Sequence, residues 1–151
     1  NRFDVDFYFG VVVNRFVSQA MAGKPITIYG KGQQMKPMIS LDDMVRTTAN
    51  AIENIEEGYN VYNQFEVPIS IVEIANTIKE SCEKRFNKPV QIDHIPNPRI
   101  EDEEHEMSMR NKKFILKLAD SQIKVSVVDA IDQICQDLHP YKDTFSDFMR
   151  K

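Results

Sequence analysis

The chain has 151 residues, of which 42% are hydrophobic and 28% are charged, a composition typical of one globular domain that can close a core. Its net charge of −4 argues against nonspecific binding to nucleic acid or anionic lipid, because both need a surplus of Lys and Arg on one face. No apolar run is long enough to cross a membrane, and the first residues lack the pattern of a signal peptide. We therefore expect a soluble, cytoplasmic chain.

The first predicted helix runs from about Gly10 to Ala22 and ends at Gly23, because apolar residues recur there at helical spacing. An aromatic cluster at Phe7–Phe9 precedes it. Core packing is the first interpretation of that cluster, and a surface that binds a partner is the alternative.

The stretch from Gly23 to Asp43 combines a strand at Ile26–Tyr29, a glycine turn and a basic arm that carries Lys36. Glycine allows close backbone approach and lysine neutralises phosphate, so the stretch can hold a planar, negatively charged ligand. The alternative is a surface turn with ordinary solvated lysines.

A second helix begins at Ser40 or Asp42 and runs to about Asn54, with an apolar side. That side carries Val45, Ala49, Ile52 and Ile55. A strand is expected next, at Tyr59–Phe65. It ends in Asn63 and Gln64, which are candidate polar contacts because ligands of open α/β sheets bind at strand ends. Alternatively, these two amides cap loop backbone.

A capping box at Ser70–Glu73 begins a third helix, and alternation predicts a strand from Val90 to Ile95. Two further helices are expected at Lys112–Leu118 and Ser126–Leu138. The two cysteines, Cys82 and Cys135, lie in apolar periodic segments and are interpreted as buried free thiols, although a disulfide between them is an alternative.

Between these elements, Arg99 follows two prolines and can present its planar guanidinium to phosphate. The acidic run Glu101–Glu106 comes next. It is interpreted first as a solvated segment, with a grip on ribose hydroxyls as the alternative. No metal site is expected, since no loop brings several oxygens together at the offsets that a hard cation needs.

Several catalytic motifs are absent from the sequence. The Gly30–Gly32 turn lacks the third glycine of a dinucleotide fingerprint, no tyrosine is followed four residues later by lysine, and no serine lies in a nucleophile elbow. The chain therefore has no candidate catalytic residue, and its candidate site residues are all of the binding type.

Taken together, the motifs resemble the extended short-chain dehydrogenase/reductase family of nucleotide-sugar enzymes. They are NRF at Asn14–Phe16, GKPITIYGKGQQMKPMISLDD at Gly23–Asp43, VYNQF at Val61–Phe65, SIVEIA at Ser70–Ala75 and NPRIEDEEH at Asn97–His105. The last motif and NQF are similar to the UDP-sulfoquinovose synthase type within that family.

The resemblance implies an α/β fold of mixed helices and short strands, the C-terminal substrate-binding portion of such an enzyme without its Rossmann half. Residues 1–151 would form a single nucleotide-sugar-binding domain, of which about 42–65 would return to the Rossmann sheet. That missing half would bind NAD and carry the catalytic Tyr and Lys, so this chain alone would be inactive.

The implied reaction converts UDP-glucose and sulfite to UDP-sulfoquinovose. The implied partners are a UDP-glucose-type nucleotide sugar, sulfite, and either the Rossmann half or a second copy of the chain. A non-catalytic sugar-nucleotide-binding module and a 4-epimerase or 4,6-dehydratase type are alternatives.

The family's binding roles fall on ten residues. Thr27 and Tyr29 would lie beside uracil, Lys36 and Arg99 would contact the diphosphate, and Glu101 and Glu104 fall where the family contacts ribose. Near the sugar nucleotide the resemblance places Asn14, Arg15, Asn63 and Gln64. Lys36 stands where the family usually has arginine. Lysine keeps the positive charge but lacks the bidentate fork of a guanidinium.

Overall fold

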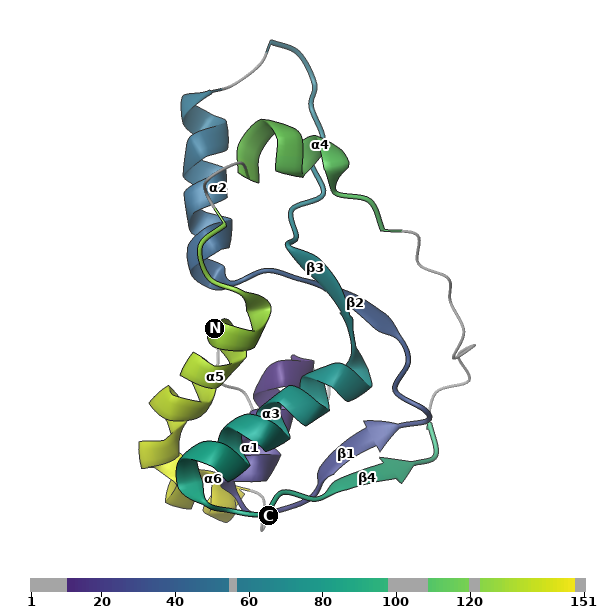
Figure 1. The fold of residues 1–151 in the computed structure, drawn as a ribbon, viewed down its shortest axis with the longest axis vertical. Helices are drawn as coiled ribbons and strands as arrows, with labels where there is room; N and C mark the ends of the chain where they lie inside the picture. The colour runs from purple at the N-terminus through teal and green to yellow at the C-terminus, as the bar shows by residue number, and fades with distance from the viewer. Residues whose placement is uncertain (1–10, 55–56, 98–108, 120–122, 149–151) are drawn as a thin grey trace. The chain divides into compact units, whose positions relative to one another are not determined.

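A computed structural model describes residues 11–54, 57–97, 109–119 and 123–148 (Figure 1). The predictions for Phe7–Phe9, Ile55, Arg99 and Glu101–Glu106 lie outside these residues. The described residues belong to two compact units. The first unit draws on Asn1–Gln34, Ser70–His105 and Ile131–Lys151, and the second on Met35–Ile69 and Glu106–Ala130.

The first unit is built on a parallel pair of strands, β1 (Ile26–Tyr29) and β4 (Ile92–Ile95), in which Ile26 faces Ile92 and Tyr29 faces Ile95. Helices α1 (Val12–Met21) and α3 (Ile71–Phe86) lie side by side next to this pair (Figure 1). The 3₁₀ turn η2 (His139–Tyr141) and helix α6 (Lys142–Phe148) complete the unit, together with the end of α5 (Val127–Leu138).

The core of the first unit follows from strand and helix periodicity. Along β1, Ile26 and Ile28 are fully buried, while Thr27 and Tyr29 point the other way and are partly exposed. The buried faces of the helices meet these isoleucines, and the largest of their buried side chains are Phe16, Val17, Ile74 and Ile78. Helices α1, α3 and α5, both strands and the burial of the two cysteines were predicted from the sequence.

The second unit contains β2 (Met35–Met38), which pairs with β3 (Val67–Ser70), and helix α2 (Leu41–Glu53). Helix α4 (Lys112–Phe114) continues into the π-helical turn η1 (Ile115–Ala119). A small core forms around Phe114 and Leu118, against which four half-buried side chains pack: Ile39, Ala51, Tyr62 and Ile123.

Two expectations for the second unit need correction. The strand predicted at Tyr59–Phe65 is irregular in the structure, and the strand lies instead at Val67–Ser70. Side chains take up its backbone groups, since Asn111 Nδ2 donates to the Phe65 carbonyl at 2.7 Å. The apolar side of α2 is also exposed, with Val45 58% and Ile52 66% accessible. The helix buries its polar residues Asp43 and Thr47 instead.

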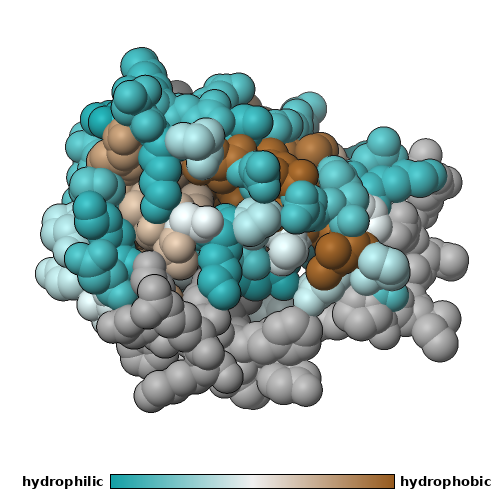
Figure 2. All heavy atoms as spheres, turned by 90° about the horizontal axis from the view of Figure 1, so that it is seen from below, coloured by the Kyte–Doolittle hydropathy of each residue, from teal (hydrophilic) through white to brown (hydrophobic). Residues whose placement is uncertain are grey.

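The surface in the view of Figure 2 is mainly hydrophilic, with hydrophobic residues showing between polar ones. Among the described residues, no helix has the length and apolar character needed to span a membrane.

Candidate functional site

One edge of β1 is completed by side chains instead of by a third strand. On the side that faces β4, Ile26 N donates to Gln91 O at 2.8 Å and Gly30 N donates to Ile95 O at 2.9 Å. On the opposite side, Thr27 N donates to Gln19 Oε1 at 3.2 Å, and Gln19 Nε2 donates to Thr27 Oγ1 at 2.8 Å. The amide of Gln19 thus takes the place of a neighbouring strand.

Arg15, one helical turn before Gln19, completes this arrangement. Its Nη2 donates to the Thr27 carbonyl at 3.0 Å, and its guanidinium carbon lies 5.0 Å from the Tyr29 ring centroid and 5.2 Å from that of Phe16. The buried Nε has no hydrogen-bond partner among the described residues. The guanidinium is therefore held by one carbonyl and two aromatic rings, a favourable cation–π arrangement.

We call Arg15, Gln19, Thr27 and Tyr29 the Arg15 cluster. Three of its members were predicted as site residues, and the structure brings them into contact. A fourth predicted residue, Asn14, is 3% exposed beside Arg15 on α1, and its carbonyl accepts from Ser18 Oγ at 2.7 Å. Sequence reasoning missed Gln19, and its spacing of four residues from Arg15 on one helix face was the available signal.

The glycine turn after β1 is fixed to its neighbours. Gly30 and Gly32 have φ of 63° and 72°, a region that favours glycine, and a Cβ on Gly32 would lie 2.7 Å from Ile28 Cγ2. The Gly32 carbonyl accepts from Val72 N at 2.9 Å, and His94 Nδ1 lies 2.7 Å from the Gly30 carbonyl, to which it must donate. The glycines therefore allow close packing of the turn against α3.

The other described site residues lie in the second unit. Lys36 is exposed on β2. Asn63 Nδ2 donates to Arg110 O at 2.9 Å, and Gln64 Nε2 donates to Met44 O at 2.9 Å. Both amides thus cap backbone carbonyls, as the alternative interpretation expected. Their role in binding stays a prediction. Arg99, Glu101 and Glu104 lie outside the described residues.

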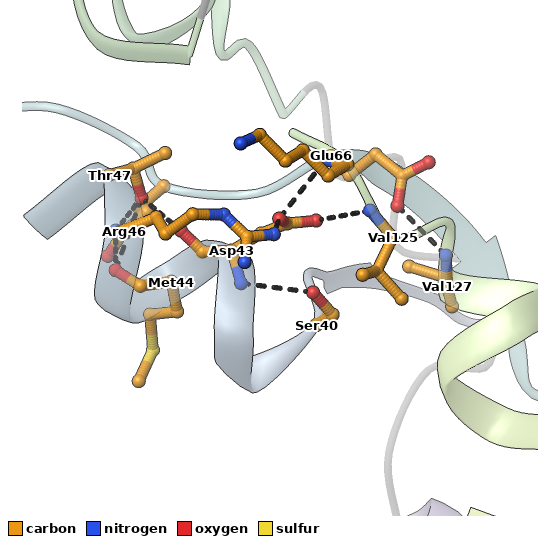
Figure 3. Close-up of polar contacts among 10 residues, drawn as sticks. Ser40, Asp43, Met44, Arg46, Thr47, Glu66, Val125 and Val127 are labelled. Atoms are coloured by element: carbon orange, nitrogen blue, oxygen red, sulfur yellow. Dashed lines mark hydrogen bonds and ion pairs between the residues drawn. The ribbon is translucent and has the colours of Figure 1, made fainter. Parts of the chain in front are cut away.

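A buried carboxylate that sequence reasoning did not single out organises the second unit. Asp43 is fully buried, and its two oxygens accept from the backbone N–H groups of Lys124 at 3.1 Å and Val125 at 3.0 Å (Figure 3). Arg46 forms an ion pair with it. Burial alone would raise the pKa of Asp43, but these hydrogen bonds hold that pKa below its ordinary value.

Asp43 thereby ties the start of α2 to the segment before α5. Nearby, Glu66 Oε2 accepts from Val127 N at 2.9 Å, which places a negative charge at the first turn of α5 (Figure 3). Both contacts join residues far apart in the chain, so their role here is structural.

The described residues include no cluster that could hold a metal ion, and their glycine turn after β1 differs from a dinucleotide-binding turn. Within them, no group of three or more His, Cys, Asp or Glu side chains could hold a metal ion. The glycine turn after β1 leads into β2, whereas a dinucleotide pyrophosphate needs a helix N-terminus after such a turn. This glycine turn therefore does not match the turn of a dinucleotide site.

Comparison with known proteins gives clear relatives. The chain is 36% identical over 149 residues to a UDP-sulfoquinovose synthase of Sulfolobus acidocaldarius, covering 97% of the chain and 37% of the relative. It is 35% identical over 134 residues to the chloroplastic UDP-sulfoquinovose synthase of Spinacia oleracea, covering 87% of the chain and 28% of the relative. The chain thus spans about a third of the length of these relatives. No family model matches it.

Solved structures share the fold. An epimerase of Methanothermobacter thermautotrophicus matches with a TM-score of 0.73 and 18% identity, over 92% of this chain and 40% of that one. UDP-glucuronic acid 4-epimerase of Bacillus cereus, solved with UDP-glucuronic acid and NAD, matches with a TM-score of 0.65 and 23% identity, over 85% of this chain and 40% of that one.

Proposed function

We propose that this chain is the substrate-binding part of a NAD-dependent nucleotide-sugar enzyme. The chain belongs to the extended short-chain dehydrogenase/reductase family and is similar to its UDP-sulfoquinovose synthases. Its α/β fold is that of the C-terminal portion of the family's epimerases, as predicted from the sequence. The reaction we propose for the whole enzyme is conversion of UDP-glucose and sulfite to UDP-sulfoquinovose. The observation that carries this proposal is the sequence identity of 36% extending over 97% of the chain.

The Arg15 cluster supports the assignment of the nucleotide end of the substrate to the first unit. Arg15 and Gln19 hold the Thr27 backbone, and Arg15 lies over the Tyr29 ring, so the side chains that would flank a uracil are fixed before ligand arrives. Pre-organisation of this kind reduces the ordering cost of binding. We propose Thr27 and Tyr29 for the uracil, with Asn14 and Arg15 behind them.

The remaining predicted contacts stay in the proposal in the roles that the family assigns. Lys36 and Arg99 would neutralise the diphosphate, and Glu101 and Glu104 would accept from ribose hydroxyls. Asn63 and Gln64 would approach the sugar nucleotide. Since the glycine turn after β1 leads into a strand and not into a helix, we propose that NAD binds to another part of the enzyme, which also supplies the catalytic groups.

The exposed apolar face of helix α2 supports the proposal that the second unit binds a partner. Four large apolar side chains on this helix are exposed, from 39% for Met44 to 66% for Ile52. They are Leu41, Met44, Val45 and Ile52. A contiguous exposed apolar surface on a helix is typical of an interface. We propose that residues 1–151 form one domain, and that this face of α2 binds the cofactor-binding half of the enzyme.

An activity assay tests the proposed reaction. The enzyme that contains this chain, supplied with NAD, UDP-glucose and sulfite, should form UDP-sulfoquinovose, detected by mass spectrometry, and should form none without sulfite. Formation of UDP-galactose with or without sulfite would contradict the synthase assignment and indicate a 4-epimerase. The isolated chain, our negative control, should form neither product.

A further inference from the structure

A cavity of about 310 Å³ lies in the first unit, where the C-terminal ends of α1 and α3 lie near η2 and α6. We call it the Lys88 cavity. Its wall combines apolar and polar side chains, and the polar ones include Asn87, Lys88, His139 and Lys142. Among the described residues that line it there is no Asp or Glu. Its volume is at the small end of the range for ligand sites, about 300–1,000 Å³. The Arg15 cluster contributes no residue to this wall.

The hydrogen-bonding groups of this wall are largely unused by the chain itself. Lys88 Nζ donates to Met21 O at 3.0 Å, which is its one hydrogen bond among the described residues, so two of the three ammonium N–H groups remain. Within the described part of the chain, the Asn87 amide and the His139 ring nitrogens form no hydrogen bond. A histidine ring carries an N–H in either tautomer. Three side chains of this wall can therefore donate to a molecule in the cavity.

The fold holds these donors in place. The half-buried Lys88 side chain passes close to Gly23, where an added Cβ would lie 3.3 Å from the Lys88 Nζ. The His139 ring stacks on Phe86, with ring centroids 3.9 Å apart and an interplanar angle of 6°. Asn87 ends α3 in the left-handed conformation, with φ of 47°. Groups that are fixed before a ligand arrives reduce the ordering cost of binding.

The balance of charge in the Lys88 cavity favours an anion. The C-terminal end of a helix carries about half a negative charge, so α1 and α3 together bring about one. Lys88 and Lys142 bring two positive charges. Glu83, near the end of α3, is engaged elsewhere, because its Oε1 accepts from Val90 N at 3.2 Å. The cavity is therefore positive, in a chain whose net charge is −4.

A second and more open cavity, of about 610 Å³, shares Phe86 and His139 with the first. Its wall adds Lys84 and Arg85. Arg85 is neutralised, since its Nε donates to Asp132 Oδ1 at 2.7 Å, but the exposed Lys84 adds a further positive charge. Positive charge on both sides of the shared rings attracts small anions to this end of the first unit.

We propose that the Lys88 cavity binds a phosphate group, carried by a small phosphate monoester or by inorganic phosphate, at a site apart from the proposed nucleotide site. Lys88 and Lys142 neutralise its charge, and the Asn87 amide and the His139 N–H donate to its oxygens. In a monoester, the carbon part contacts the Phe86 ring.

Phosphate matches this set of donors better than a carboxylate does. A phosphate monoester carries about −1.5 to −2 charges at pH 7 and three strong acceptor oxygens. Two lysines balance that charge, and the neutral donors of Asn87 and His139 complete the contacts of the oxygens. A carboxylate has a single charge and two oxygens, so it would leave part of this wall without a partner.

An NMR titration of the isotope-labelled chain at constant ionic strength tests the proposal, with inorganic phosphate and glycerol 3-phosphate as probes. We expect saturable amide shift changes at Asn87, Lys88, His139 and Lys142 with millimolar probe, and none with sodium chloride. Tighter binding of glycerol 3-phosphate would identify the ligand as a monoester. Equal affinities would identify it as inorganic phosphate, and either result supports the site.

Two variants remove donors without disturbing the fold. His139→Phe keeps a ring stacked on Phe86 and removes the ring nitrogens, and Asn87→Gly suits the positive φ and removes the amide. Each should weaken phosphate binding about fivefold, as loss of one hydrogen bond does. Lys88→Met, checked for folding by circular dichroism, should weaken it at least about tenfold. Lys112→Met, at an exposed position of the second unit, is the control and should bind as the native chain does.

UDP-glucose added to the phosphate-saturated chain separates this site from the proposed nucleotide site. The shift changes at Lys88 and His139 should persist. Displacement of phosphate by UDP-glucose would overturn the proposal, because the phosphate would then occupy the diphosphate position. Shifts that do not saturate, or unchanged affinity in both His139→Phe and Asn87→Gly, would overturn it as well. A chain that binds phosphate here but not UDP-glucose would contradict the proposed function and leave this site standing.

Discussion

The Arg15 guanidinium donates to the carbonyl of Thr27 at 3.0 Å, twelve residues further along the chain, and so joins helix α1 to the edge of strand β1 that faces away from β4. Together with Gln19 it supplies the hydrogen bonds that a third strand would otherwise give. The same guanidinium lies over Tyr29, which couples the stability of this edge to the position of an aromatic ring proposed to flank uracil.

Replacing Arg15 by Gln should therefore affect both stability and nucleotide binding. Loss of the carbonyl hydrogen bond and of the ring contacts should lower the free energy of unfolding by about 1–2 kcal/mol. UDP should bind about tenfold more weakly, in line with about 1.4 kcal/mol. Urea denaturation and calorimetry measure the two effects. Arg110→Gln, the same change at an exposed position, is the control and should alter neither.

Lys36 offers a test in the opposite direction. If it contacts the diphosphate, Lys36→Arg restores the bidentate fork and should tighten UDP binding by about 1 kcal/mol. Lys112→Arg, at an exposed position of α4, is the matched control. Unchanged or weaker affinity for UDP in calorimetry would indicate that Lys36 is an ordinary solvated lysine that does not contact the diphosphate.

Asp43→Asn should destabilise the second unit in a way that depends on pH. The hydrogen bonds hold the pKa of Asp43 below its ordinary value, so its charge adds stability that is present above the unfolded pKa of 3.8 and is lost as pH falls through the folded pKa. At pH 7 we expect a loss of about 3 kcal/mol in the free energy of unfolding.

The difference between the native chain and Asp43→Asn should shrink below about pH 4 in urea denaturation followed across pH. Asp42→Asn, one residue away and exposed, should cost little at any pH. If the Asp43→Asn chain is as stable as the native chain at pH 7, this carboxylate does not anchor the second unit.

The exposed apolar side of α2 should make the isolated chain self-associate or bind an apolar dye. Ile52→Lys should reduce both without lowering the free energy of unfolding, because Ile52 is 66% exposed. Val128→Lys, an equivalent change at a 53% exposed position of α5, should leave dye binding unchanged. Light scattering and dye fluorescence measure the effect. Equal loss in both variants would argue against a specific face on α2.

Where local chemistry decides the structure, the sequence was sufficient. The Ser70 hydroxyl accepts from Glu73 N at 3.2 Å and the Glu73 carboxylate accepts from Ser70 N at 2.8 Å, so two residues three positions apart define the start of α3. The β1 strand was likewise predicted from four β-favouring residues, and its turn from the two glycines that follow them.

Where distant residues decide, the sequence was insufficient. The polar side of α2 is buried because Asp43 accepts from Lys124 and Val125, 81 and 82 residues away, and no local pattern reports such a contact. The segment Tyr59–Phe65 has the residues of a strand, but a strand needs a neighbour, and Asn111 satisfies its last carbonyl instead.

The central claim is that the Arg15 cluster at the edge of β1 binds the uridine end of a nucleotide sugar. An NMR titration of the isotope-labelled chain with UDP-glucose tests it most directly, with ATP as the matched nucleotide control. We expect the largest amide shift changes at Thr27, Tyr29 and Gly30, reproduced by UDP and absent with ATP. Unchanged β1 amides at millimolar UDP-glucose, or equal changes with ATP, would contradict the claim.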